Sequence, residues 1–351
     1  MVLDRLFELV RLLAAIPGPV GHEDAVIMTL QGLWRPFVEE IWVDRLGNLT
    51  CKVGGKGPKI LLSAHADEYC FVVKGVTLEG FLAIDSGQSY RNGPDTARAF
   101  LGHPALVLTP EGGRFEGVFG TTTGHLASYI DLGRGFKWEY VFVDIGIESY
   151  KQAESQGITV GSRIISNSPI RRLGDRVVGK ALDDRIGLAI ITVLLERITP
   201  NCLGVELYIR VSTQEEIDSV GASVEQSIHP DLCIVLDVGP VGDIPPLKNH
   251  GISTGLGKGP ILVHKDSNVH YHRKSVQSLT KLAHGSGIPL QHAVYVGYGT
   301  DGLEFTKKGI PSMVVAIPTR YTHSPFEMVS LVDAEITLAL LQECIKSLGV
   351  E

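Results

Sequence analysis

The feature that most constrains the fold is the alternation of short apolar segments with segments of helical period. The apolar segments are typical of strands buried on both faces of a sheet, and they occupy residues 59–67, 204–213, 231–238 and 311–319. Helical periodicity occupies residues 3–15, 185–198, 275–287 and 332–348. Strands and helices that alternate in this way predict an α/β domain with a mostly parallel sheet flanked by helices.

A segment with a different residue pattern interrupts this alternation. Between residues 69 and 164, strand-like runs such as 70–76 and 140–146 alternate with glycine-rich turns, and a helical pattern appears only at 149–157. This pattern is typical of a small β-rich domain. The sequence therefore predicts an α/β domain built from residues 1–68 and 165–351, with a β-rich domain inserted at 69–164.

Charge and cysteine content exclude several classes of protein. The chain of 351 residues has a net charge of -7, whereas a nucleic-acid-binding protein is expected to be basic. Its 5 cysteines are scattered without a CxxC pair, which is typical of reduced thiols in the cytoplasm. Residues 1–18 indicate an amphipathic helix rather than a signal peptide, and no apolar run is long enough to span a bilayer. We expect a cytoplasmic protein that binds neither nucleic acid nor membrane.

Histidines and carboxylates gather at the predicted ends of the apolar strands. They are His65, Asp67, Glu215, Glu216, Asp237 and His323, and Asp183 and Asp184 precede the helix at 185–198. Each has a simpler explanation when taken alone, because acids before a helix cap it and adjacent loop acids are usually solvated. In open α/β sheets, however, ligand sites form beyond the carboxyl ends of the strands. We therefore expect these residues to converge on one crevice.

A crevice lined by these acids and histidines would need positive charge to balance the carboxylates. Three acids and two neutral histidines would be buried together, namely Asp183, Glu216, Asp237, His65 and His323. Without counter-ions the acids would repel one another and their pKa values would rise. Two divalent cations would balance them, and histidine with carboxylate suits zinc or cobalt, with manganese as an alternative. Two such ions can hold a water between them and lower its pKa, which leaves Glu215 as the general base for hydrolysis.

Five short motifs then indicate a family. "HADE", "GKALDDRIG", "VSTQEE", "GTDG" and "IPTRYTHSP" occur in this order. Each is weak alone, and together they are specific. In these motifs the chain resembles the dinuclear metalloaminopeptidases that assemble as tetrahedral (TET) dodecamers, a family that includes glutamyl aminopeptidases and proteins named endoglucanase M. The resemblance covers nearly the whole chain, including the position of the β-rich insertion.

The resemblance implies a role for each site residue. One metal would be held by His65, Asp183 and Asp237, and the other by Asp183, Glu216 and His323. Glu215 would be the base, and Asp67 would orient His65 through a hydrogen bond. Substrate contacts are expected from Thr300, Asp301 and Arg320. In this group of enzymes the peptide between Asp183 and Asp184 is often cis.

The resemblance also implies a partner and a substrate class. The inserted domain would serve dimerisation and assembly, so we expect a homododecamer that acts on short peptides. The chain departs from the family's pattern at Tyr69, Asp218, Val220 and Tyr298. These positions bear on the side-chain preference of the pocket and on the assembly rather than on the ligands.

The leading hypothesis is an aminopeptidase that removes N-terminal residues from short peptides through a metal-bridging water activated by Glu215. Hydrolysis of another amide, such as an N-acyl amino acid, is the near alternative, because the metal ligands do not encode the substrate. A glycoside hydrolase needs two carboxyl groups roughly 5 to 9 Å apart around the sugar, which the adjacent Glu215 and Glu216 do not obviously provide. The complete ligand set argues against an inactive scaffold protein.

His270 and His272 form a separate candidate. Two residues apart, they would point the same way on a strand and could begin a further metal site. No acid or cysteine completes a ligand set nearby in the sequence, so a surface or interface strand is the expectation.

Overall fold

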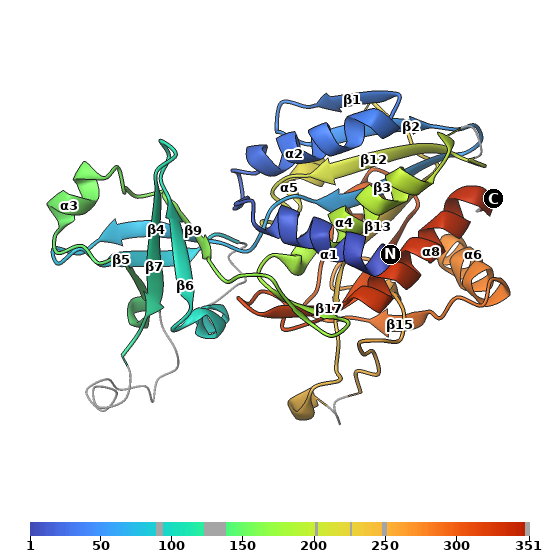
Figure 1. The fold of residues 1–351 in the computed structure, drawn as a ribbon. Helices are drawn as coiled ribbons and strands as arrows, with labels where there is room; N and C mark the ends of the chain where they lie inside the picture. Colours follow the sequence, from blue (N-terminus) through green and yellow to red (C-terminus); the bar gives the residue numbers. More distant parts are fainter. Residues whose placement is uncertain (89–93, 123–137, 201–202, 225–226, 248–250, 348–351) are drawn as a thin grey trace.

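The chain folds into an α/β lobe and a separate β-barrel lobe (Figure 1). The computed structural model describes residues 1–88, 94–122, 138–200, 203–224, 227–247 and 251–347. Both parts of the predicted fold class, the helix-flanked sheet and the inserted β-rich domain, are confirmed. Among the helices that the structure describes, none combines the length and the apolar character that a membrane crossing requires.

The α-helices of the described residues follow the predicted periodicity, with short additions. They are α1 (Val2–Ala14), α2 (Asp24–Trp34), α3 (Tyr150–Ser155), α4 (Leu182–Arg197), α5 (Val220–Ser223), α6 (Arg273–Gly285), α7 (Gly302–Lys307) and α8 (Leu331–Ser347). Short 3₁₀ helices lie at Arg35–Phe37, Pro94–Phe100, Trp138–Tyr140 and Pro245–Leu247.

The α/β lobe is built on an 11-stranded sheet within the described residues. Its strands are β1 (Glu40–Val43), β2 (Leu49–Gly54), β3 (Lys59–His65), β10 (Arg171–Leu173), β11 (Arg176–Gly179), β12 (Glu206–Ser212), β13 (Leu232–Pro240), β14 (Ile261–Lys265), β15 (Gln291–Val294), β16 (Ser312–Arg320) and β17 (Glu327–Ser330). The order along the sheet is β1-β2-β12-β3-β13-β16-β17-β11-β10, and β14 joins β16 to β15.

The sheet is parallel at its centre and antiparallel at the two ends of its main path, while the branch strands β14 and β15 run parallel to each other. β12, β3, β13 and β16 run parallel, whereas β1 with β2 and β10 with β11 form antiparallel pairs. The lengths of the connections between the strands explain this difference. A tight turn can join only antiparallel strands, whereas parallel neighbours need a long crossover. The sheet is therefore mixed, and the predicted parallel arrangement describes its central strands.

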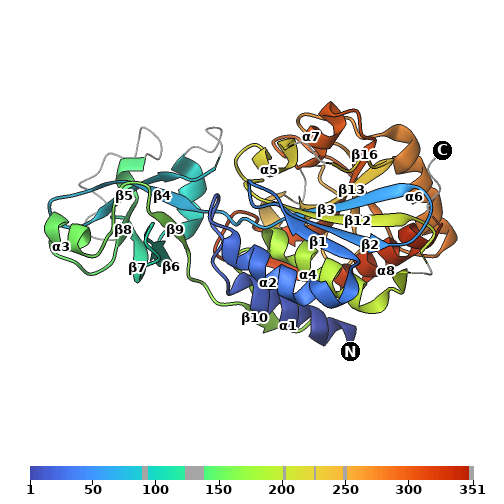
Figure 2. The ribbon, with the colours of Figure 1, turned by 90° about the horizontal axis from the view of Figure 1, so that it is seen from above.

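Helices cover both faces of this sheet (Figure 2). α4 packs across β3 and β13 on one face and is flanked there by α1 and α8. On the opposite face α7 packs against β13 and β16, and α5 packs against α7. α4 is buried from Leu182 to Leu195, as expected of a helix that is apolar on all sides.

The smaller lobe is a closed barrel, in which each of the described strands pairs with a neighbour on both sides. Its strands are β4 (Phe71–Val76), β5 (Leu82–Ser86), β6 (Pro104–Leu108), β7 (Arg114–Gly120), β8 (Phe142–Asp144) and β9 (Arg163–Ser166), in the order β4-β5-β8-β7-β6-β9. Aromatic rings fill its core, and the Phe71 and Phe100 ring centroids lie 4.9 Å apart in a T-shaped contact. The barrel follows β3 directly in the chain, so its entry lies next to the strand end that carries His65.

Candidate functional site

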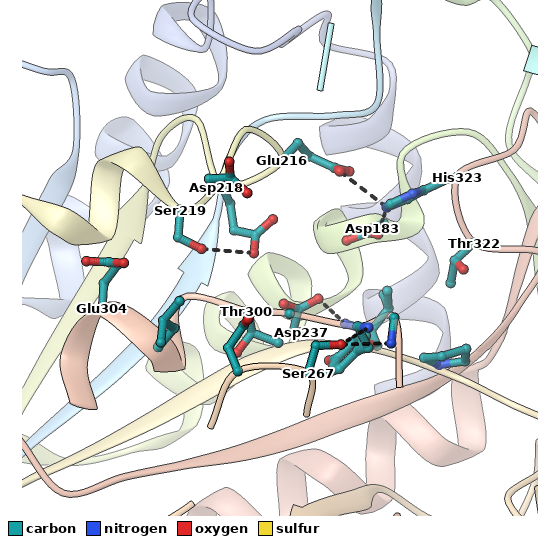
Figure 3. Close-up of a pocket in the computed structure, with 18 of the residues that line it drawn as sticks. Asp183, Glu216, Asp218, Ser219, Asp237, Ser267, Thr300, Glu304, Thr322 and His323 are labelled. Atoms are coloured by element: carbon teal, nitrogen blue, oxygen red, sulfur yellow. Dashed lines mark hydrogen bonds and ion pairs between the residues drawn. The ribbon is translucent and has the colours of Figure 1, made fainter. Parts of the chain in front are cut away.

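The central strands bring the predicted site residues to one edge of the sheet. In the pairing of β12 with β3, Ser212 lies opposite His65, so the loop after β12 emerges level with the end of β3. Asp237 belongs to β13, and His323 follows β16. Figure 3 shows the result, with Glu216 and Asp183 pointing toward His323.

Asp183 lies at the centre of this arrangement. Its Oδ1 atom is 2.9 Å from Nε2 of His65, and its Oδ2 atom is 3.4 Å from Nε2 of His323. The same His323 nitrogen lies 3.2 Å from Oε2 of Glu216. The peptide that joins Asp183 to Asp184 is cis.

Two overlapping groups of metal-ligand atoms result. In each group the ligand atoms lie within 4.8 Å of one another, and the groups are His65, Asp183 and Asp237, and Asp183, Glu216 and His323. These are the two sets that the family resemblance implied, and Asp183 belongs to both. Nitrogen and carboxylate oxygen donors in this number and spacing suit zinc and its neighbours in the transition series.

The electrostatics of the site favour cation binding. Burial, together with the Asp183 carboxylate, raises the pKa of Asp237 well above its ordinary value. Burial likewise raises the pKa of Glu215 well above its usual range. Burial alone would lower the pKa of His65, but Asp183 and Asp67 raise it well above the ordinary value. These directions describe a buried excess of negative charge, which bound cations would neutralise.

The hydrogen bonding of the Glu216 carboxylate indicates whether a metal ion would fit this site. Its Oε2 atom contacts His323, but its buried Oε1 atom has no hydrogen-bond partner among the described residues. A buried carboxylate oxygen without a donor is costly, and coordination of a cation would satisfy it. The residues present therefore fit a metal centre.

Asp67 contacts the loop that carries both glutamates. It is completely buried, its Oδ1 accepts the N–H of Glu215, and its Oδ2 accepts the N–H of Glu216, both at 2.9 Å. The expected hydrogen bond to His65 is instead a 3.4 Å contact between Nδ1 and Oδ1 that lacks hydrogen-bond alignment. The contact with the loop has no signal in the sequence, because it depends on β3 and β12 being neighbours in the sheet.

Glu327 is a site residue that sequence reasoning missed. Its two carboxylate oxygens accept the N–H of Asp183 at 3.1 Å and the N–H of His323 at 2.9 Å. Burial and the nearby Asp183 raise the pKa of Glu327 to about 8. It thus ties together the backbones of two candidate ligands. The only available signal was its position four residues after His323, at the start of β17.

Tyr69 connects the site to the barrel. Its ring centroid lies 4.9 Å from that of His323 on one side and 5.3 Å from that of Phe100 in the barrel core on the other. Tyr69 is one of the positions at which the chain departs from the family's pattern. A barrel side chain therefore packs directly against a candidate metal ligand.

A cavity of about 700 Å³ adjoins the ligand groups. Besides the candidate ligands Asp183, Glu216, Asp237 and His323, its walls include Glu215, Asp218, Tyr298, Thr300, Leu303, Glu304 and Lys307. Thr300, one of the expected substrate contacts, therefore lies where a ligand would bind. Asp301 is buried and accepts the Ser212 hydroxyl, and Arg320 forms an ion pair of 2.7 Å with Asp243. The structure does not bring these last two side chains into the cavity wall.

The histidine pair at 270 and 272 does not share a strand. His270 forms an isolated bridge with Lys265, and His272 is the N-cap of α6, where its Nδ1 lies 2.8 Å from the hydroxyl of Ser275. Both are exposed, and neither belongs to a three-residue ligand group within the described part of the chain.

Comparison with known proteins agrees with this geometry. Residues 47–340 match the model of the M42 glutamyl aminopeptidase family. The chain is similar to aminopeptidase APDkam598 from the archaeon Desulfurococcus kamchatkensis, with 28% identity, 98% of this chain and 95% of that chain covered, and a TM-score of 0.90. It is also similar to the TET aminopeptidase of the marine sediment archaeon Thaumarchaeota archaeon SCGC AB-539-E09, with 30% identity, 99% and 97% coverage, and a TM-score of 0.89.

A third similar structure belongs to a protein that forms large assemblies. The TET1 peptidase of Pyrococcus horikoshii, which can assemble into a tetrahedron or a large octahedral shell, has 26% identity, 97% and 99% coverage, and a TM-score of 0.84. The family match extends over most of the sequence, and the structural similarity covers both lobes. The chain belongs to the M42 glutamyl aminopeptidase family and is an aminopeptidase.

Proposed function

We propose that this aminopeptidase works with two divalent cations. One would be held by His65, Asp183 and Asp237, and the other by Asp183, Glu216 and His323. The observation that carries the proposal is the pair of ligand groups that share Asp183. The unpartnered Oε1 of Glu216 and the mutual perturbation of the buried carboxylates support it. Zinc or cobalt suits this donor set, with manganese as an alternative.

Glu215 is proposed as the general base. When bound, the cations would polarise the scissile carbonyl and lower the pKa of the attacking water. Glu215 lines the cavity beside the ligand groups, and its backbone is held by Asp67. Its carboxylate takes the proton from the water and later delivers it to the nitrogen of the cleaved amide, which leaves as the amine of the shortened peptide. The Ser219 hydroxyl, 3.4 Å from Oε1 of Glu215, helps to orient this carboxylate.

We expect activity on short peptides to depend on bound metal. The purified protein should hold about two divalent cations per chain, and chelation should abolish hydrolysis of aminoacyl p-nitroanilides until Zn²⁺ or Co²⁺ is restored. Elemental analysis and a p-nitroanilide panel measure this directly. N-acyl amino acids and carboxymethylcellulose serve as comparison substrates for the deacylase and glycosidase alternatives. A metal-free protein whose activity is indifferent to chelator and added cations would contradict the metal proposal.

Self-association is proposed to use the barrel, with a homododecamer as the assembly. Large apolar side chains at barrel turns are exposed to solvent, notably Leu78 at 83% and Val160 at 70%. Exposed apolar side chains of this size are candidates for a protein interface. The tetrahedral or octahedral assembly of the Pyrococcus horikoshii TET1 peptidase supports the proposal that this chain self-associates.

Light scattering tests the assembly. At micromolar concentration we expect a mass of about twelve chains of 38.0 kDa, and Leu78→Asp should reduce it by placing a charge in the interface. A wild-type chain that remains a monomer under these conditions would rule the proposal out.

We also propose a cytoplasmic location for the enzyme. Cys51, Cys70, Cys233 and Cys344 are buried free thiols, as is usual in a reducing compartment.

A further inference from the structure

The loop that carries Glu215 has an unusual backbone. Gln214, Asp218 and Ser219 all adopt left-handed φ angles, of 55°, 62° and 55°. This region is unfavourable for residues other than glycine and persists only where surrounding contacts hold it. The contacts that hold this loop therefore decide where the Glu215 carboxylate lies.

Two buried carboxylates from other parts of the chain hold three successive N–H groups of the loop. Asp67 accepts those of Glu215 and Glu216. Glu23 accepts the N–H of Gln214 at 3.0 Å through Oε1, and the same atom accepts the N–H of Gly21 at 2.7 Å. Glu23 is only 4% exposed and belongs to the N-cap position of α2, far from Gln214 in the sequence.

Glu23 lies in an environment of buried charged side chains. Arg185 is completely buried, and its pKa is lowered by burial but raised in turn by Glu68, Asp67 and Glu23. Arg185 is closely packed against Gly18, where an added Cβ would lie 2.6 Å from its Nη2 atom. Glu23 therefore lies in a buried, charged environment, and one of its oxygens reaches the loop.

We propose that Glu23 is a positioning residue for catalysis, which fixes the Glu215 carboxylate by holding the N–H of Gln214. The inference rests on the proposed role of Glu215 as the base. Glu23 touches neither the candidate metal ligands nor the cavity among the contacts that the described residues show, so it acts through the loop alone. Its loss should alter the chemical step while metal binding remains, because Glu23 holds the residue next to Glu215, whereas Glu216 lies one residue farther along and is tied to both Asp67 and His323.

The expected effect is a fall in kcat. A displacement of about 1 Å at a reacting group can cost about 10²-fold, so Glu23→Ala should lower kcat by about 10- to 100-fold. KM should change by less than about twofold, because the substrate contacts are elsewhere. Glu23→Gln keeps an oxygen that can accept both N–H groups, and it should recover most of the activity. Glu23→Asp keeps the charge but is one methylene too short, and it should behave like alanine.

Asp333 provides a matched control. It is completely buried and also accepts two backbone N–H groups, from Gly257 at 2.6 Å and Gly259 at 2.7 Å, in a loop without candidate catalytic residues. Asp333→Ala should lower the melting temperature as Glu23→Ala does, because each leaves buried donors unpaired. It should leave kcat unchanged.

The experiment combines kinetics on an aminoacyl p-nitroanilide, metal content and amide hydrogen exchange. Exchange at Gln214 should accelerate in Glu23→Ala and Glu23→Asp but not in Glu23→Gln or Asp333→Ala. The inference is overturned if Glu23→Ala keeps wild-type kcat, if Asp333→Ala loses kcat equally, or if Gln214 exchange is unchanged. If the proposed role of Glu215 as the base is wrong, Glu215→Gln would remain active. That result distinguishes a failure of the proposed function from a failure of the inference about Glu23. If Glu23→Ala does not fold, the contrast between Glu23→Gln and Glu23→Asp decides in the same way.

Discussion

Glu215→Gln is expected to retain both cations and the fold while kcat falls by about 10²- to 10⁴-fold, the usual worth of a general base. The amide has nearly the shape of the carboxylate, and the backbone N–H of residue 215 still donates to Asp67. What is lost is the ability to take a proton. Steady-state kinetics and elemental analysis on one preparation measure both quantities, and KM should change much less than kcat.

Glu216→Gln is the matched control for this experiment, because it makes the same chemical change one residue away. Glu216 belongs to a candidate ligand group with Asp183 and His323, so this variant should lose one cation and recover partly in excess metal. If Glu215→Gln lost metal while Glu216→Gln stayed loaded and inactive, the two roles would be exchanged. Full activity in both variants would contradict the mechanism proposed for Glu215.

Asp183→Asn should have the largest effect on metal content. Asp183 is common to both ligand groups, so weakening this single ligand should release both cations. Losing several kcal/mol of charge stabilisation in the transition state corresponds to a fall in kcat/KM of about 10³-fold or more. Asp237→Asn, which touches one group only, should release one cation and leave the other in place.

Asp184→Asn is the matched control for the bridging residue. Asp184 is completely buried beside Asp183, but its Oδ1 atom accepts the N–H of Gly187 and it belongs to neither ligand group. Asp184→Asn should therefore keep two cations per chain. Metal analysis that finds two cations in Asp183→Asn would show that the groups are not joined through this residue.

Much of the site could be predicted because it lies where the sheet topology must place it. Residues at or shortly after the ends of buried strands, such as His65 and Glu216, are brought to one edge when those strands are parallel neighbours. Periodicity indicates burial, and burial of several acids together requires counter-charge, so a metal site could be predicted from the chain, whereas its two ligand sets were implied by the family resemblance. The inserted barrel was predicted for a similar reason, because its short strands and turns are local features.

The remaining features depend on contacts that no local pattern encodes. The antiparallel sheet edges follow from which strands are joined by tight turns. Arg320 was expected at the substrate and instead pairs with Asp243, because the direction of a side chain at the end of a strand is set by its neighbours in space.

The tertiary structure alone also decided what holds the site in place. Asp67, Glu23 and Glu327 each accept backbone N–H groups of the site, and their partners lie on segments brought together only by folding. A backbone N–H is present at every residue except proline, so the sequence carries no mark of which one a buried carboxylate will bind. The sequence predicted which side chains are candidates to hold metal and to move a proton. Folding decided which carboxylates hold those side chains in position, because that choice depends on distances of about 3 Å between segments far apart in the chain.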